Sequence, residues 1–121
     1  IKIGTSFNIG YKSETLKYTR QLVLNPFFGY EGKVKITDPE IKETVKEYSQ
    51  LDGAFLIDND GSIITTGAYI DVDTEGIDLP GLGTRHRSCA ALTKLTNSIA
   101  VVVSSSGSIR IFKGGKVAIK I

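Results

Sequence analysis

The sequence contains no methionine and no tryptophan, and it has one cysteine, one histidine and three prolines among 121 residues. A single cysteine excludes an internal disulfide and a cysteine-rich zinc site, and it favours a reducing cytoplasm over a secreted setting. Because the chain begins with Ile1 and has no Met, we expect a domain excised from a longer protein, or a processed one.

Long apolar runs and an excess of one charge are also missing. The longest apolar stretches, at residues 55–57 and 99–103, have strand length, whereas a membrane span needs roughly 20 residues. The net charge of +2 comes without a run of Lys or Arg, so neither a membrane nor a nucleic acid is expected as a partner of this domain. Any bound anion is therefore expected at a local site.

The composition is otherwise that of an ordinary globular protein. Hydrophobic residues make up 40% and charged residues 23%, and a chain of this length can bury one core without metals or disulfides. We therefore predict a single domain over residues 1–121. Helical and strand-like segments are interspersed, which predicts an α/β (mixed α+β) fold with a central mixed twisted β-sheet flanked by helices.

Apolar spacing and capping residues predict three helices. Ser13 is a candidate N-cap for a helix over residues 14–24, and Asp38, followed by a proline, predicts a second helix that ends near residue 50. The third helix is expected over residues 84–96. Short β-like runs predict five strands, the first two forming a hairpin, at residues 54–57, 62–70, 99–104, 108–112 and 117–121.

Two connecting segments are expected to be irregular. Residues 71–83 form an acidic and glycine-rich loop. The loop over residues 25–32 carries Phe27, Phe28 and Tyr30, which we expect to cap the core.

Arg85, His86 and Arg87 fall in the first turn of the predicted helix over residues 84–96. The free N–H groups and the dipole of a helix start favour anions, so cations there are unfavourable without a ligand. A phosphate would satisfy the N–H groups and the guanidinium groups together, and the glycines before the helix would let it approach the backbone. The alternative is that both arginines lie in solvent and His86 packs against a neighbour.

The tripeptide Asp52-Gly53-Ala54 opens a predicted strand, although Asp-Gly is typical of a turn. A carboxylate followed by two minimal side chains leaves room for a ligand against the backbone, while Asp52 holds a metal or accepts a proton. The alternative is a simple turn from helix to strand.

Other patterns fail when they are compared residue by residue. The acidic residues from Asp71 suggest a calcium loop, but its twelfth position is Leu82, where a bidentate Glu is required. A dinucleotide fingerprint starting at Gly81 would need a glycine where His86 stands. The single Cys89 has no base beside it in the sequence and is interpreted as a buried helix thiol.

The two motifs together resemble the catalytic domain of diadenylate cyclases, the enzymes that make cyclic di-AMP. Asp52-Gly53-Ala54 is followed about thirty residues later by Gly83-Thr84-Arg85-His86-Arg87, then by a helix and an apolar strand that ends at Ser104. This motif-bearing core spans about residues 52–111, and the first fifty residues match less distinctly.

The resemblance implies a nucleotidyltransferase that joins two ATP molecules into cyclic di-AMP and releases two pyrophosphates. Each ribose 3′-hydroxyl attacks the α-phosphate of the other ATP, across a face-to-face homodimer or a higher oligomer built from such pairs. Asp52 would bind Mn²⁺ or Mg²⁺ and help to deprotonate the 3′-hydroxyl. Gly53 and Ala54 would lie against the nucleotide.

The remaining site residues also follow from the resemblance. Tyr69 and Ile70 would contact adenine, and Ser104 would contribute a hydroxyl near the phosphates. Many members carry acidic residues after that serine, one of which can join the metal site, whereas this chain has serines at positions 105 and 106. The triphosphate would be held by the segment that starts the third helix, namely Gly83, Thr84, Arg85, His86, Arg87 and Ser88.

A rival hypothesis from another class is a sensor module that binds ATP or cyclic di-AMP without catalysis. The serines at 105 and 106 favour it, and the presence of Asp52 argues against it. A purely structural domain would leave the cations at a helix start unexplained.

Overall fold

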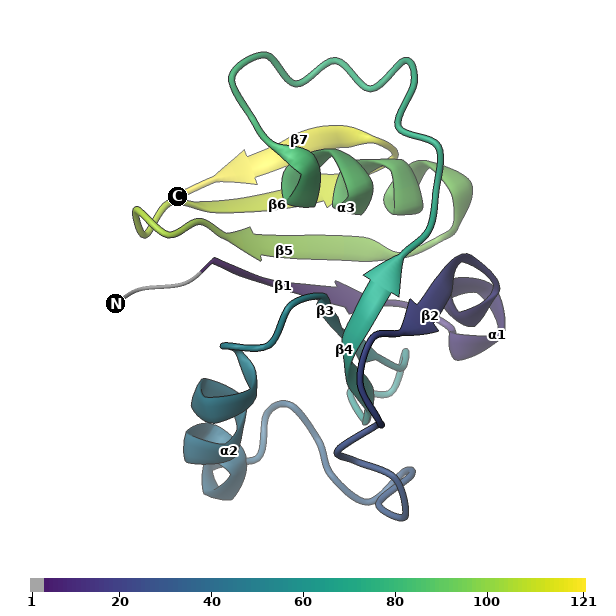
Figure 1. Ribbon diagram of the computed structural model, residues 1–121, viewed down its shortest axis with the longest axis vertical. Helices are drawn as coiled ribbons and strands as arrows, with labels where there is room; N and C mark the ends of the chain where they lie inside the picture. The colour runs from purple at the N-terminus through teal and green to yellow at the C-terminus, as the bar shows by residue number, and fades with distance from the viewer. Residues whose placement is uncertain (1–3) are drawn as a thin grey trace.

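The computed structural model describes residues 4–121, in which one seven-stranded mixed sheet is flanked by helices (Figure 1). This confirms the predicted fold class. The strand order across the sheet is β2-β4-β3-β1-β5-β6-β7. The strands are β1 (Thr5–Ile9), β2 (Thr19–Gln21), β3 (Ala54–Ile57), β4 (Ile63–Ile70), β5 (Ile99–Val103), β6 (Ile109–Lys113) and β7 (Lys116–Lys120).

The centre of the sheet combines a parallel and an antiparallel neighbour. Strand β1 pairs in parallel with β3, so that Phe7 lies opposite Phe55, and it pairs antiparallel with β5. All other strand pairs are antiparallel. Because β1 and β3 run the same way, the ends of two strands from distant parts of the sequence meet at the same edge.

Two hydrophobic clusters lie on the two faces of the sheet, because successive strand residues point to opposite sides. Ala54 belongs to the cluster packed with the long helix α3 (Thr84–Leu95), whereas its neighbour Phe55 belongs to the other cluster. In Figure 1, α3 lies over β5, β6 and β7. The second cluster is covered from outside by residues of helix α2 (Lys42–Tyr48) and of the turn η2 (Pro39–Ile41) before it.

The prediction of a helix over residues 14–24 is wrong. A single α-helical turn, α1 (Lys12–Thr15), continues as the 3-10 turn η1 (Leu16–Tyr18), and the chain then becomes strand β2. Here Thr19 pairs with Ile70 and Gln21 with Ala68, so pairing with the edge of β4 outweighs the helical spacing. The N-cap of α1 is Tyr11 and not Ser13.

Strand β1 was not predicted at all. Its inward positions are polar, because Ser6 and Asn8 are each 1% exposed, whereas Thr5, Phe7 and Ile9 are only half-buried. The usual signal of alternating apolar residues is therefore inverted in this strand. In the interior, the Nδ2 of Asn8 donates a hydrogen bond to Ser98 Oγ at 2.9 Å, whereas its Oδ1 has no partner among the described residues.

The helix that follows Asp38 is confirmed. The carboxylate of Asp38 accepts a hydrogen bond from Glu40 N at 2.9 Å, Pro39 occupies the first turn, and that turn is 3-10 in form. The third helix and the hairpin of β3 and β4 are confirmed as well.

The prediction that the loop aromatics all cap the core holds for one of the three. Phe27 is 5% exposed and packs in the second cluster, but Phe28 is 80% and Tyr30 56% exposed. The side chain of Asn25 accepts a hydrogen bond from Phe27 N at 2.9 Å, which fixes Phe27 in place. The turns that follow carry the other two rings into solvent.

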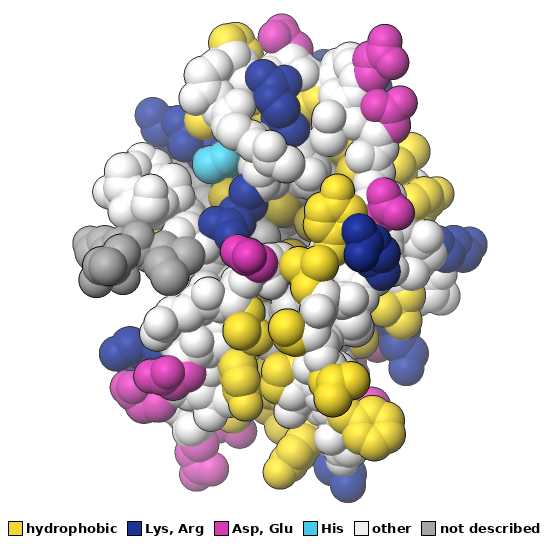
Figure 2. Space-filling view, viewed as in Figure 1, with side chains coloured by type: hydrophobic (Ala, Val, Ile, Leu, Met, Phe, Trp, Pro, Cys, Tyr) yellow, Lys and Arg dark blue, Asp and Glu magenta, His cyan; other side chains and the backbone are white. Residues whose placement is uncertain are grey.

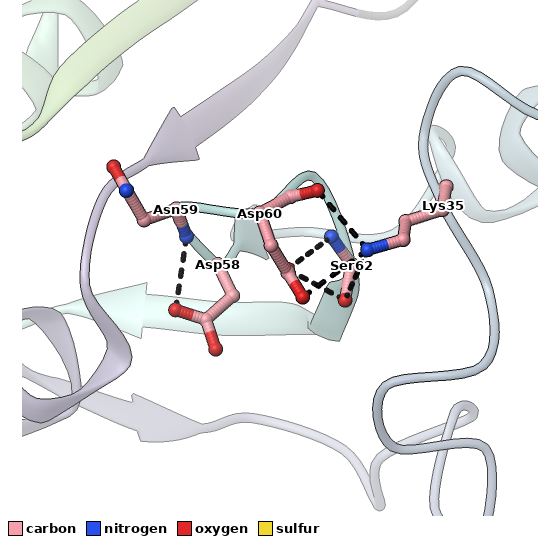
Figure 3. A network of polar contacts seen from close by, with 5 residues as sticks. All are labelled: Lys35, Asp58, Asn59, Asp60 and Ser62. Carbon is pink, nitrogen blue, oxygen red and sulfur yellow. Dashed lines mark hydrogen bonds and ion pairs between the residues drawn. The ribbon is translucent and has the colours of Figure 1, made fainter.

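The turn between β3 and β4 anchors the segment that leads to η2 (Figure 3). The carboxylate of Asp60 accepts a hydrogen bond from Ser62 Oγ at 2.6 Å and pairs with Lys35 Nζ at 3.1 Å. The hydrogen bonds from Ser62 and Lys35 hold the pKa of Asp60 below its ordinary value. An isolated bridge between Lys35 and Ser62 completes this connection.

Candidate functional site

A cavity of about 210 Å³ lies between the first hairpin and helix α3. We call the residues from the hairpin the strand wall and the residues from α3 the helix wall. Ser6 of β1 also lines the cavity. The strand wall consists of Gly53, Ala54, Ala68, Tyr69 and Ile70, and the helix wall consists of Thr84, Arg85, Ser88 and Cys89.

The strand wall depends on a close approach of two backbones. Ala54 and Ala68 are directly paired across β3 and β4. Gly53 has a φ of +94°, and a Cβ added there would lie 2.6 Å from the carbonyl oxygen of Ala68. No other residue fits this position without strain. Gly53 does follow a helix at a turn, as the alternative interpretation held, but the position also lines the cavity.

Tyr69 brings a further residue to the edge of the cavity. The guanidinium of Arg20 lies 4.6 Å from the centroid of the Tyr69 ring, and the two residues are paired in the register of β2 and β4. Such stacking of a cation on an aromatic face is attractive and restrains the ring. Arg20 was not predicted as a site residue, because the local spacing predicts a helix over residues 14–24.

The helix wall is made by residues on one side of α3. Successive residues of a helix point about 100° apart, so only residues such as i, i+3 and i+4 share a side. Arg85, Ser88 and Cys89 have this spacing, and all three line the cavity. The three consecutive residues Arg85, His86 and Arg87 therefore point in different directions.

Arg85 lies between the cavity and the end of β5. A Cβ added to Gly4 would lie 2.6 Å from Arg85 Nη1 and 3.2 Å from the carbonyl oxygen of Val103. The Arg85 side chain makes no hydrogen bond or ion pair with other residues of the range 4–121. A cation at the positive end of α3 thus has no counter-charge within the described chain.

Arg87 points to the loop between β4 and α3. Its Nε donates to the carbonyl of Leu82 at 3.2 Å, its Nη1 to that of Ile77 at 3.0 Å and its Nη2 to that of Leu79 at 3.1 Å. All three guanidinium nitrogens are therefore bonded to backbone carbonyls.

His86 points to the sheet. Its ring centroid lies 6.1 Å from that of Phe112, and its Nε2 is buried without a hydrogen-bond partner among the described residues. Burial, followed by the charges of Arg110 and Arg85, lowers the pKa of His86 below the ordinary 6.5. The imidazole is thus neutral at physiological pH. In Figure 2 the one histidine (cyan) only just reaches the surface, beside Lys or Arg side chains.

Cys89 and Ser6 complete the floor of the cavity. Cys89 is 1% exposed, and burial raises the pKa of its thiol to about 11, so the thiol is protonated and unreactive. The interpretation as a buried helix thiol is confirmed. Its place in the cavity wall was missed, although its position four residues after Arg85 is a helical spacing that indicates a shared side. No sequence signal pointed to Ser6 or Ala68.

Asp52 and Ser104 lie outside the cavity wall. Asp52 directly precedes Gly53, is exposed, and its carboxylate makes no hydrogen bond or ion pair with the described residues. Ser104 follows β5, where its Oγ accepts a hydrogen bond from Ser108 N at 3.1 Å and lies 2.7 Å from Ser106 Oγ. Gly83 is the N-cap of α3, and a Cβ added there would meet no atom within 4 Å.

A metal ion at this site would take most of its coordinating atoms from the bound nucleotide and water, and few from side chains. Within residues 4–121, no three His, Cys, Asp or Glu side chains are grouped so as to hold a metal ion. The free carboxylate of Asp52 suits an ion such as Mg²⁺, which is commonly bound by one or two carboxylates together with substrate phosphates and water.

None of the helices in the described part of the chain is long and apolar enough to cross a membrane.

The family described as DisA bacterial checkpoint controller nucleotide-binding, abbreviated DAC, matches residues 1–117 of the chain. The chain belongs to this family. The match includes both motifs and all of the first fifty residues, where the motifs gave no signal. The resemblance to diadenylate cyclase catalytic domains is thereby confirmed.

Two curated relatives of this DAC domain are named diadenylate cyclase. The one from Methanocaldococcus jannaschii is 40% identical over 117 residues, which are 95% of this chain and 37% of the relative. The one from Haloferax volcanii is 40% identical over 121 residues, which are 98% of this chain and 44% of the relative. The chain thus spans less than half the length of either relative.

Two solved structures share the fold of this DAC domain. A hypothetical membrane spanning protein from Bacillus cereus is 21% identical with a TM-score of 0.71, over 98% of this chain and 54% of that protein. A double mutant of DacA from Staphylococcus aureus is 21% identical with a TM-score of 0.67, over 98% of this chain and 75% of that one.

The cavity brings together most, but not all, of the predicted site residues. Five predicted residues lie outside its lining: Asp52, Gly83, His86, Arg87 and Ser104. Those within its lining are Gly53, Ala54, Tyr69, Ile70, Thr84, Arg85 and Ser88.

Proposed function

We propose that this DAC domain is a diadenylate cyclase, which condenses two ATP molecules into cyclic di-AMP and releases two pyrophosphates. The observation that carries the proposal is the cavity, with apolar strand residues on one side and the cationic start of α3 on the other. The 40% identity to two proteins named diadenylate cyclase supports it.

The two walls suit the two ends of ATP. The strand wall offers Tyr69, Ile70 and Ala54 to the flat, largely apolar adenine ring. The helix wall offers the hydroxyls of Thr84 and Ser88, the guanidinium of Arg85 and the free N–H groups of the first turn of α3. These groups are suited to phosphate oxygens. Gly83, which has no side chain at the N-cap, leaves that backbone open to the ligand.

One protomer does not provide a complete site for two reacting ATP molecules. The cavity, at about 210 Å³, is smaller than the roughly 300–1,000 Å³ of typical ligand pockets. We therefore place the triphosphate at the open side, facing a second protomer that carries its own ATP. A two-fold, face-to-face homodimer would bring each ribose 3′-oxygen to the α-phosphorus of the other ATP, and each attack would expel one pyrophosphate.

Two chemical roles are assigned to the carboxylate of Asp52, which has no partner among residues 4–121. It would accept the proton of the 3′-hydroxyl, and it would hold Mn²⁺ or Mg²⁺ together with phosphate oxygens and water. When bound, the ion would neutralise charge on the phosphates. Arg85 would stabilise the charge that develops on the departing pyrophosphate.

The remaining predicted residues have less direct positions in this proposal. Ser104 would contribute its hydroxyl from the end of β5, near Arg85. His86 would act as a neutral group that supports the first turn of α3 through its packing on Phe112. The cytoplasm stays the expected location.

The proposal is tested by incubating the purified domain with ATP and either Mn²⁺ or Mg²⁺, and by measuring cyclic di-AMP by chromatography with mass detection. Turnover per protomer should rise with protein concentration, because an active centre needs two protomers. Binding of ATP without any product at all protein concentrations would favour the sensor module instead.

A further inference from the structure

We infer that Arg87 is a positioning residue, which holds the loop over residues 71–83 against α3 and does not bind phosphate. The inference rests on the proposed function, since it assigns different roles to Arg85 and Arg87 at one nucleotide site. Three hydrogen bonds of 3.0 to 3.2 Å carry it, because they engage Nε, Nη1 and Nη2 of the same guanidinium.

The carbonyls that Arg87 bonds belong to the residues that anchor the loop. Ile77 is 8% and Leu79 is 6% exposed, and both pack in the cluster that contains Cys89 and Ile70. Side-chain burial and the guanidinium of Arg87 therefore both fix Ile77 and Leu79. Leu82, the third partner, packs partly buried against the same cluster.

The loop joins the two walls of the cavity. It begins directly after Ile70 of the strand wall and ends directly before Thr84 of the helix wall. A change in the loop therefore shifts both ends of the bound ATP, and not the phosphate end alone.

The electrostatics of the helix start also supports different roles for Arg87 and Arg85. A cation in the first turn of a helix opposes the helix dipole, but the three carbonyl oxygens around Arg87 supply the negative ends of dipoles. Arg85 has no such partners in residues 4–121. If Arg87 turned to a phosphate, the partly buried carbonyls of Ile77 and Leu82 would lose their donor, which is costly, whereas that of Leu79 also accepts from Leu82 N.

The two arginines should therefore respond differently when the ligand loses its phosphates. We would measure dissociation constants for ATP and for adenosine with the wild-type domain, Arg85→Ala, Arg87→Ala and Arg87→Lys. Arg87→Ala should raise the dissociation constants of ATP and of adenosine by a similar factor, about tenfold, as expected for a net loss of hydrogen bonds. Arg85→Ala should raise the dissociation constant of ATP by a factor at least about tenfold larger than that of adenosine.

Two controls separate geometry from charge. Arg87→Lys keeps the charge but has no planar fork, so it should behave like Arg87→Ala. Lys94→Ala removes an exposed charge from the last turn of the same helix and should change neither dissociation constant. Arg87→Ala that weakens ATP but leaves adenosine unchanged, or Arg87→Lys that restores ATP binding, would overturn the inference.

Amide hydrogen exchange tests the inference without a ligand. In folded Arg87→Lys, the amides of residues 74–82 should exchange about tenfold faster than in the wild type, because the loop opens more often. Unchanged exchange there would also overturn it. A wild-type domain that binds no nucleotide would refute the proposed function, whereas the exchange result would still decide the role of Arg87 in the loop.

Discussion

The two walls of the cavity are built in opposite ways. The strand wall is held by main-chain pairing, with Gly53 packed so closely on Ala68 that a side chain has no room. The helix wall presents a cation, Arg85, which has no partner among residues 4–121, at the end of a helix where cations are unfavourable. The first arrangement is required by folding alone, whereas the second would be stabilised by the anionic ligand that we propose.

This difference matters for interpreting motif residues. Gly53 and Arg85 both belong to motifs and both line the cavity, but the contacts around them imply different consequences of substitution. Changes in the strand wall should lower the free energy of unfolding. Changes at Thr84, Arg85 and Ser88 of the helix wall should lower affinity and leave the fold intact, whereas Cys89 of the same wall is a core residue.

Asp52 directly precedes the strand wall but lies outside the cavity lining, and its substitution should affect the reaction and not the fold. Asp52→Asn should lower the rate of cyclic di-AMP formation by about 100-fold or more, the usual scale for loss of a positioned base. ATP binding at saturating metal and the free energy of unfolding should largely persist, since the carboxylate has no partner among the described residues.

The matched control for Asp52→Asn is Glu47→Gln, which removes from α2 an exposed carboxylate that has no ion-pair partner in the described part of the chain. Its turnover should equal that of the wild type. Near-normal turnover in Asp52→Asn would show that the proton and metal assignments are wrong.

Gly53→Ala should give the largest loss of stability. Its cost combines the positive φ with the overlap on Ala68, for a total of about 3 kcal/mol in the free energy of unfolding. Gly29 has a similar φ of +91° but no atom within 4 Å of an added Cβ. Gly29→Ala should therefore cost only about 1 kcal/mol. Chemical denaturation of both variants measures the difference, and equal costs would exclude a steric role for Ala68.

Arg85→Ala, unlike Gly53→Ala, should lower ligand affinity and not stability. ATP binding should weaken by about 2 kcal/mol, as for other hydrogen bonds to charged groups. The free energy of unfolding should stay unchanged or rise by about 0.5 kcal/mol, because an unfavourable cation leaves the helix start. Calorimetric titration and chemical denaturation give the two values. A large loss of stability with unchanged affinity would make Arg85 structural.

His86 should give the smallest effect, a pH dependence of stability. Burial lowers the pKa of His86 in the folded state, so the unfolded state takes up the proton first as the pH falls below 6.5. Stability should therefore decrease between about pH 7.5 and pH 5.5, by at most about 1.4 kcal/mol per pH unit. Chemical denaturation across this range should show a smaller slope for His86→Gln, and equal slopes would contradict the burial of a neutral imidazole.

The sequence was most informative where local signals and the tertiary structure agree. Asp38 before a proline predicts a helix start, and the Asn59-Asp60-Gly61 turn predicts the hairpin, because both depend on neighbouring residues. Strand β1 has polar residues at its buried positions, and β2 exists through its pairing with β4. Neither property is visible in a local window.

The site was predictable in part for a related reason. The motifs identify Gly53, Thr84 and Arg85, but a motif does not tell which side each residue faces. Helix geometry shows that Arg85 and Arg87 diverge, whereas the carbonyl partners of Arg87 come from a loop whose course the sequence does not define. Arg20 was hidden by the incorrect helix.

The central claim is that one nucleotide binds between the strand wall and the helix wall. Its most direct test is an NMR titration of the wild-type domain with ATP, which follows the backbone amides of residues 4–121. Ala54, Ala68, Tyr69 and Ile70 should shift together with Thr84, Arg85 and Ser88. Shifts confined to other regions, such as the residues of α2, or no shifts at saturating ATP, would contradict it.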